Sequence, residues 1–327
     1  MPDFQVDSAK LYENLISLYL KSSKLEQQII RTCAIAYEPL NRTVVLDCLI
    51  YLGVKDKDKP LSPINLKTYI DRLLKLNLLT QERSQGIQCN SLLIDIAIRD
   101  AIQKGQFEAI VEVIEAKIPV PSYGKLGLRT FRSESQFIRE VRIGIYRQDV
   151  DFVAKQFDDF YRFGYSQQKI TLDTILLQVC NNPFDPEWFK TLNSTFYEVG
   201  LGTILTNGML KLKNTDQALA LLHQNFQENS DRCTDPLLLV LIEQSLLRAD
   251  LKTAQAAYER LSSEYKEAGN ALIAWLYFLK GDRATAITQF RLSLKSIRKS
   301  TGKRQIYFSG EPGLFFILAL IQERTTE

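Results

Sequence analysis

Hydrophobic residues recur at spacings of three and four along most of the chain, which is the period of an amphipathic helix. In the N-terminal third this pattern predicts helices over residues 7–20, 25–36, 43–52, 63–76 and 91–104. The fourth of these opens with Ser62 and Pro63, a capping residue followed by a proline at the first helical position. Residues 78–82 and 86–89 instead predict two short strands around a turn.

The helical period continues after residue 105 and predicts helices over residues 106–117, 135–147, 150–163, 171–180, 186–192 and 197–212. Pro119 and Pro121 interrupt it and mark a break. We therefore predict an all-α protein with a small β-hairpin. Its first domain would cover residues 1–110, and a helical-repeat domain would cover residues 111–327.

The clearest helical hairpin lies at residues 270–297. In its first helix, Ile273, Ala274, Tyr277 and Phe278 share one face, because they recur at spacings of three and four. Small and aromatic residues alternate on the facing side of the second helix, at Ala286, Phe290 and Ser293. Gly281 can end the first helix in the left-handed conformation, and Asp282 can cap the second.

This hairpin resembles a tetratricopeptide repeat. The motif positions are occupied by Ala274, Tyr277, Gly281, Asp282, Ala286, Phe290 and Ser293. Asn270 stands at the early tryptophan position, and no terminal proline follows. Ala218 with Leu222 and Ala254 with Tyr258 repeat the Ala286–Phe290 pair at offsets of 36 and 32 residues. The resemblance implies a solenoid whose concave face binds an extended partner.

Three helices followed by a hairpin is the order of a winged-helix domain, and residues 69–102 resemble the winged helix of signal-transduction ATPases and related regulators. Cations that could meet phosphates or base edges are Lys67, Arg72, Lys75 and, in the wing, Arg83. The net charge of residues 61–83 is only +2, so a winged helix used for packing or protein contacts is the alternative.

Positive charge gathers near the C-terminus. Residues 280–304 hold eight basic residues and one acid, a net +7, so the rest of the chain carries −4 of the overall +3. The basic residues at the end of this segment are Lys295, Arg298, Lys299, Lys303 and Arg304. They indicate an anion-binding surface, the alternative being a solvated helix face.

Residues 298–322 resemble the non-catalytic N-terminal region of large bacterial Swi/Snf-type helicase-like ATPases. The residues that carry this resemblance are Thr301, Gly302, Lys303, Arg304, Phe308, Gly313, Leu314, Phe315 and Leu318. No G-x-x-x-x-G-K-[ST] motif accompanies them, so the motor itself is missing. The apolar helix expected at residues 313–321 would need more chain or a partner to cover it, and the first of these alternatives implies that the chain is a fragment.

Candidate catalytic chemistry is sparse. The single histidine, His223, and five scattered cysteines cannot form the usual zinc sites, and no nucleophile elbow or dinucleotide turn is present. We expect no enzyme activity, no cofactor and no metal. The chain opens without a signal peptide, and its longest apolar runs are too short to span a bilayer, so a cytoplasmic protein without membrane contact is expected.

These observations lead to three functional hypotheses. The first is a nucleic-acid-associated regulatory or scaffolding region that uses the basic residues named above, and the resemblance implies that it belongs to a helicase-like ATPase. The second is a scaffold that binds a protein or peptide on the concave repeat face. The third is a sensor fragment whose repeats bind a small effector.

Overall fold

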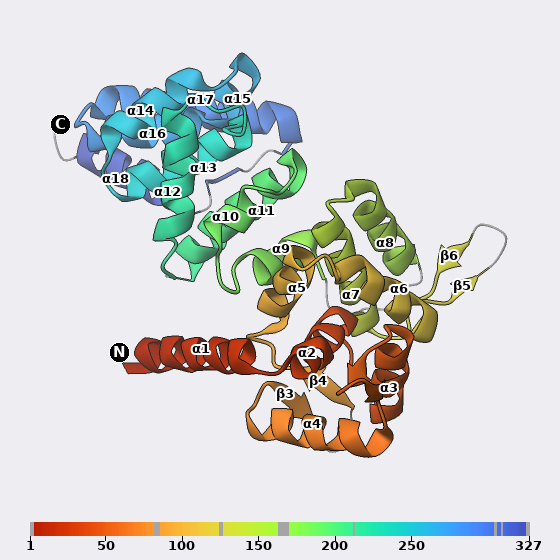
Figure 1. Cartoon of the computed structure of the whole chain (residues 1–327). Coiled ribbons are helices and arrows are strands. Elements are labelled where there is room, and N and C mark those ends of the chain that lie inside the picture. The colour runs from red at the N-terminus through yellow and green to blue at the C-terminus, as the bar shows by residue number, and fades with distance from the viewer. Residues whose placement is uncertain are drawn as a thin grey trace. The chain divides into compact units, whose positions relative to one another are not determined.

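The computed structural model describes residues 3–81, 86–123, 127–162, 170–211, 213–303, 306–308 and 310–324. Within these residues the protein has eighteen helices and three two-stranded hairpins, so the all-α prediction is confirmed (Figure 1). Contacts divide the chain into two compact units, Met1–Pro183 (unit 1) and Phe184–Glu327 (unit 2). None of the described helices has both the length and the apolar content needed to cross a bilayer.

Unit 1 contains nine helices and all three hairpins among its described residues. They are α1 (Asp3–Lys21), α2 (Lys24–Ala36), α3 (Arg42–Tyr51), β1 (Lys55–Asp56), β2 (Lys59–Pro60), α4 (Pro63–Lys75), β3 (Leu79–Gln81), β4 (Ile87–Cys89), α5 (Ile94–Gln103), α6 (Phe107–Lys117), β5 (Ser122–Tyr123), β6 (Leu128–Arg129), α7 (Glu134–Arg147), α8 (Val150–Arg162) and α9 (Leu172–Cys180).

Helix α2 is the centre of unit 1. It packs against helices α3 to α7 and strand β4, and its residues from Ile29 to Ala36 are all buried (Figure 1). A capping box starts the helix: the Ser23 hydroxyl accepts from the Glu26 backbone N–H, while the Glu26 carboxylate accepts from the Ser23 N–H at 2.9 Å. The predicted pair of strands is also present, with Leu79 opposite Cys89.

One hairpin was not anticipated. The alternating lysines and aspartates of residues 55–59 predict a solvated loop. In the structure β1 and β2 pair there instead, with Lys55 opposite Pro60. Lys57 and Asp58 form the two-residue turn, and both have left-handed backbone angles (φ 49° and 66°). Asp56 fixes the hairpin on α4, because its carboxylate accepts hydrogen bonds from Asn65 and Tyr69 at 2.9 and 3.0 Å.

The compact units divide the chain at a different place from the predicted domains, 1–110 and 111–327. Helix α7 packs against α2, and α9 packs against α7, so residues 134–180 share unit 1 with the N-terminal helices. The domain prediction concerns fold resemblance rather than compactness and stays a prediction.

Unit 2 consists of helices only among its described residues. They are α10 (Pro186–Phe189), α11 (Ser194–Leu210), α12 (Asp216–Gln227), α13 (Asp235–Leu247), α14 (Leu251–Arg260), α15 (Ser263–Ala268), α16 (Asn270–Leu279), α17 (Arg283–Thr301) and α18 (Glu311–Arg324). Neighbouring helices pair as α13 with α14 and α16 with α17, while α14 and α13 also contact α16.

The hairpin predicted at residues 270–297 is confirmed as α16 and α17. Gly281 has the left-handed backbone (φ 84°) that glycine adopts without a steric penalty, and the Asp282 carboxylate accepts from the Thr285 N–H at 3.1 Å. Ala274, Ala286 and Phe290 are fully buried between the helices. Helix α18 then packs on this pair through Phe315, whose ring stacks on Trp275 at 4.6 Å between centroids.

Candidate nucleic-acid interfaces

Helix α4 presents the first group of predicted cations. Ser62 accepts from the Asn65 N–H at 3.2 Å and begins the helix, as predicted. Leu66, Ile70 and Leu73 are buried, which fixes the orientation of the helix and leaves the opposite side to solvent.

The cations of α4 do not form one surface. At about 100° per residue, Lys67 and Arg72 lie about 140° apart around the helix axis. Arg72 pairs with the buried carboxylate of Glu26 at 3.2 Å, and Asp71 beside it pairs with Arg42 at 2.8 Å. Lys67 and Lys75 are exposed. The positive charge of this helix is therefore spread out and partly neutralised.

A polar pocket of about 480 Å³ lies between α4 and the β1–β2 hairpin. Lys57, Lys59 and Arg72 line it together with Asp56, whose two oxygens are already bonded to Asn65 and Tyr69. Arg83, the predicted wing cation, lies outside the described residues.

Helix α17 presents the second group. Its buried side consists of Ala286, Ile287, Phe290 and Ser293, which face the rest of unit 2. The later turns of the helix hold four exposed cations, Arg291, Lys295, Arg298 and Lys299, which we call the basic stripe. These four fall within about 100° of one another around the axis and extend over about 12 Å along it.

Three of the four cations of the basic stripe have no neutralising carboxylate among the described residues. No salt bridge joins Lys295, Arg298 or Lys299 to an acidic residue within the part of the chain that the structure describes. The neighbouring carboxylate of Glu267 accepts a hydrogen bond from Ser296 instead. Lys303 follows the end of the helix and is exposed, while Arg304 lies outside the described residues. The structure thus brings three of the five predicted C-terminal cations onto one helix face, where they are joined by Arg291.

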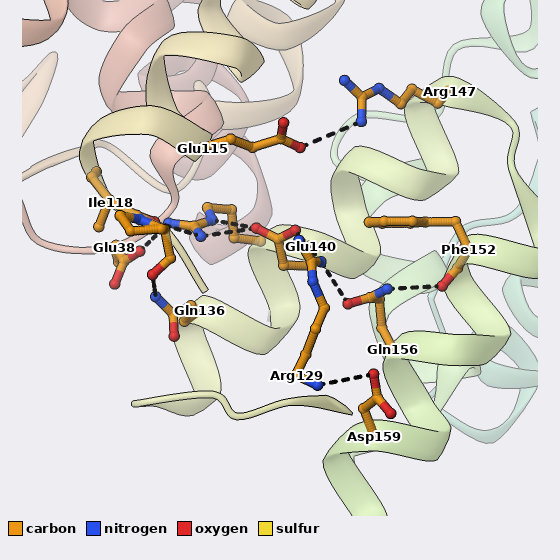
Figure 2. A network of polar contacts seen from close by, with 12 residues as sticks. Glu38, Glu115, Ile118, Arg129, Gln136, Glu140, Arg147, Phe152, Gln156 and Asp159 are labelled. Atoms are coloured by element: carbon orange, nitrogen blue, oxygen red, sulfur yellow. Dashed lines mark hydrogen bonds and ion pairs between the residues drawn. The ribbon is translucent and has the colours of Figure 1, made fainter. Parts of the chain in front are cut away.

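Charged residues also form a network inside unit 1, which the sequence did not reveal (Figure 2). Arg139 of α7 is fully buried and bonds to Glu38, to Glu140 at 2.8 Å and to the carbonyl of Ile118 at 3.0 Å. Arg129 of β6 reaches the other oxygen of Glu140 at 2.7 Å and the side-chain oxygen of Gln156 at 2.8 Å. The only sequence signal is that charges at 139, 140 and 142 leave α7 without a purely apolar face.

Glu38 and Glu140 are each held by an arginine side chain. Burial raises the pKa of Glu38, an effect that the charge of Arg139 opposes and that of Glu140 reinforces. A second buried pair joins Arg142 to Asp95, which also accepts from the Tyr146 hydroxyl at 2.8 Å. Burial, followed by the charge of Asp95, raises the pKa of Tyr146 well above its ordinary value. These contacts fasten α7 to distant segments of unit 1.

Groups able to hold a metal are not found among the described residues: no three His, Cys, Asp or Glu side chains come together there. All five cysteines are unpaired and buried.

The chain was compared with known proteins: no family model, no curated protein and no solved structure matches it.

Proposed function

We propose that the protein is a non-catalytic nucleic-acid-associated regulatory or scaffolding module, and that the basic stripe of α17 holds the phosphate backbone. The observation that carries this proposal is the exposed line of Lys295, Arg298 and Lys299, for which no salt bridge to a carboxylate is found among the described residues, with the exposed Arg291 one turn before them. One strand of a nucleic acid carries a phosphate about every 3.4 Å of helix axis, so about three phosphates fit along the 12 Å of the stripe.

The finer fold assignments belong to this proposal. Helices α2, α3 and α4 followed by the β3–β4 hairpin support a winged-helix-like domain. The buried Ala218, Ala254 and Ala286 at related positions in α12, α14 and α17 support tetratricopeptide-like repeats. Association with a helicase-like ATPase is the context that the sequence resemblance suggests. Helix α4 is the weaker interface, because Arg72 is already paired with Glu26.

The test is fluorescence anisotropy with labelled duplex DNA, single-stranded DNA and RNA at low and at moderate salt. Changing Lys295, Arg298 and Lys299 together to Glu should weaken binding at least 100-fold and, for duplex DNA, lower the slope of log K against log salt by about 3. The matched control changes the exposed Lys211, Lys213 and Lys252 to Glu, which alters the net charge equally. Equal losses in both variants, or no binding by the unaltered protein at low salt, would refute the proposal.

A protein-binding scaffold is the second candidate, and one observation favours it. Leu314, Ile317 and Ile321 are each more than half exposed and share one face of α18, because they are spaced by three and four residues. Failure of nucleic-acid binding would leave this function as the better one.

A further inference from the structure

A second pocket of unit 1 lies away from the basic residues discussed so far. It has a volume of about 420 Å³ and lies where the first turns of α2, the chain after α3, and the turn between α5 and α6 meet. Its charged side chains are Lys24, Arg31, Lys55 and Lys104, and no carboxylate lines it. Pockets for small ligands in proteins begin at about 300 Å³, so this one is large enough.

The turn after α5 brings two of the lining residues together. Helix α5 ends at Gln103, and Gly105 follows with a left-handed backbone (φ 66°). The Gln106 N–H then donates to the Ala101 carbonyl at 2.8 Å, which closes the helix end. Lys104 and Gln106 thereby reach the pocket from either side of the glycine.

Arg31 organises the interior of the pocket. Its guanidinium is almost fully buried and donates to Asp100 at 2.8 Å, to the side-chain oxygen of Gln106 at 2.7 Å and to that of Gln27 at 3.0 Å. Asp100 is shared with Lys104 at 3.0 Å and with Tyr19. Burial raises the pKa of Asp100, but hydrogen bonds from Tyr19 and Lys104 and the charge of Arg31 outweigh it, so the pKa lies below its ordinary value.

Most of the remaining polar groups are donors, and the Gln28 amide adds both a donor and an acceptor. Because the Gln106 oxygen accepts from Arg31, its amide NH₂ is left as a donor, and no hydrogen bond of that NH₂ is found among the described residues. Lys24 and Lys55 are exposed and have no ion pair there either. With Asp100 counted against the four cations, the local charge is +3. Leu25 and Val54 complete the lining with apolar surface.

We propose that this pocket binds a small phosphorylated molecule with an apolar part, of the size and charge of a nucleoside di- or triphosphate. The four cations and the Gln106 amide suit phosphate oxygens, which are acceptors. The volume exceeds what inorganic phosphate fills, and Leu25 and Val54 offer contacts to a base. The site is independent of the basic stripe and of the nucleic-acid function.

The experiment is isothermal titration of the full chain with ATP, with inorganic pyrophosphate and with a 5′-phosphorylated oligonucleotide. Lys55→Glu and Lys57→Glu form a matched pair, because both lysines are exposed on the β1–β2 hairpin. Lys55 lines the pocket around Arg31, whereas Lys57 lines the pocket between α4 and the hairpin. We expect ATP to bind, Lys55→Glu to weaken it about 10-fold or more, and Lys57→Glu to leave it within about 2-fold.

Two further variants make the result specific. Gln106→Leu removes the amide donor and should weaken ATP binding about 5-fold or more. The triple Glu variant of the basic stripe should leave ATP binding unchanged, which separates this site from the nucleic-acid function. Absence of ATP binding at millimolar concentration would overturn the proposal, as would equal effects of Lys55→Glu and Lys57→Glu. If pyrophosphate binds as tightly as ATP, the apolar lining does not contact the ligand, and that part of the proposal is overturned. If the oligonucleotide binds in a Lys55-dependent manner and ATP does not, the ligand is not a free nucleotide.

Discussion

The two compact units differ in what they bury. Among the described residues, unit 1 buries eight charged side chains, including Arg139, Glu140 and Arg142, whereas the buried polar residues of unit 2 are all uncharged. The interior of unit 2 is instead built from aliphatic and aromatic side chains, such as Trp275 and Phe290. Part of the charge of unit 1 therefore lies in internal ion pairs, while the described cations of unit 2 lie at its surface. Exposed charges without an ion pair are available to a ligand, whereas Arg139 and Arg142 are bonded to carboxylates inside unit 1.

The internal pairs of unit 1 also join segments that are distant in the sequence. Arg139 and Glu38 are 101 residues apart, and Arg142 and Asp95 are 47 residues apart. Such pairs stabilise one arrangement of the chain, because a shifted arrangement would leave a buried charge without a partner. The comparison predicts that the two units respond differently to the same kind of substitution.

The largest effect is expected at Arg139. Arg139→Leu leaves Glu38 without its arginine and removes one partner of the fully buried Glu140, which should lower the free energy of unfolding by about 3–5 kcal/mol. Urea unfolding followed by circular dichroism measures this. The matched change in unit 2, Arg283→Leu at the exposed first residue of α17, should stay within about 0.5 kcal/mol. Similar losses at both positions would show that buried charge does not distinguish the units.

The next effect compares two helical glycines. A methyl group on Gly144 of α7 would lie 2.5 Å from a Val153 methyl and 2.8 Å from the Phe152 ring, so Gly144→Ala should destabilise by about 1–3 kcal/mol. On Gly202 of α11 the nearest atom would be 4.0 Å away, so Gly202→Ala should stabilise by about 0.5–1 kcal/mol through helix propensity. Thermal unfolding of the two variants should therefore shift in opposite directions, and a shared direction would contradict the close approach of α7 and α8.

A smaller effect concerns pH. The pKa of Asp100 is lower in the folded than in the unfolded protein, so its contribution is present above the unfolded pKa of about 4 and is lost as pH falls through the folded value. The stability difference between the unaltered protein and Asp100→Asn should therefore shrink below about pH 4. Urea unfolding at pH 7, 4 and 3 measures it. Asp158→Asn, at an exposed position without an ion pair among the described residues, is the matched control, and an equal pH dependence in both variants would contradict this role of the Asp100 contacts.

The smallest effect is expected on the basic stripe. Changing Lys295, Arg298 or Lys299 singly to Gln should alter the free energy of unfolding by no more than about 0.5 kcal/mol, because each is exposed. The same variants should weaken nucleic-acid binding if the stripe is an interface. A stability loss of several kcal/mol would instead assign these residues a structural role.

Local rules predicted much of the fold. The α16–α17 hairpin follows from the spacing of apolar residues and from Gly281 and Asp282, and the start of α4 follows from Ser62 and Pro63, because each of these signals acts within a few residues. The positive surface of α17 could also be predicted, because helical spacing alone places Lys295, Arg298 and Lys299 on one side of the helix. The winged-helix and tetratricopeptide assignments remain predictions.

Features that depend on distant residues were missed. The sequence places charged residues outside by default, so the buried Arg139 and Arg142 could not be foreseen without their partners 47 to 101 residues away. The β1–β2 hairpin lacks alternating apolar residues and has no glycine in its turn; Asp56 holds it through contacts with α4. The pocket around Arg31 likewise needs three separate segments to meet.

The bonds of Tyr19 have a consequence for motion. Terminal helices usually fray, and their amide protons then exchange quickly with solvent. Tyr19, however, is buried, and its hydroxyl bonds to Asp100 of α5 and to Arg31 of α2. The last turns of α1, from Leu15 to Tyr19, can open only when those bonds break. Hydrogen exchange at these amides should therefore be as slow as the opening of α2 and α5. The exchange rate at this end of α1 then measures the stability of the centre of unit 1.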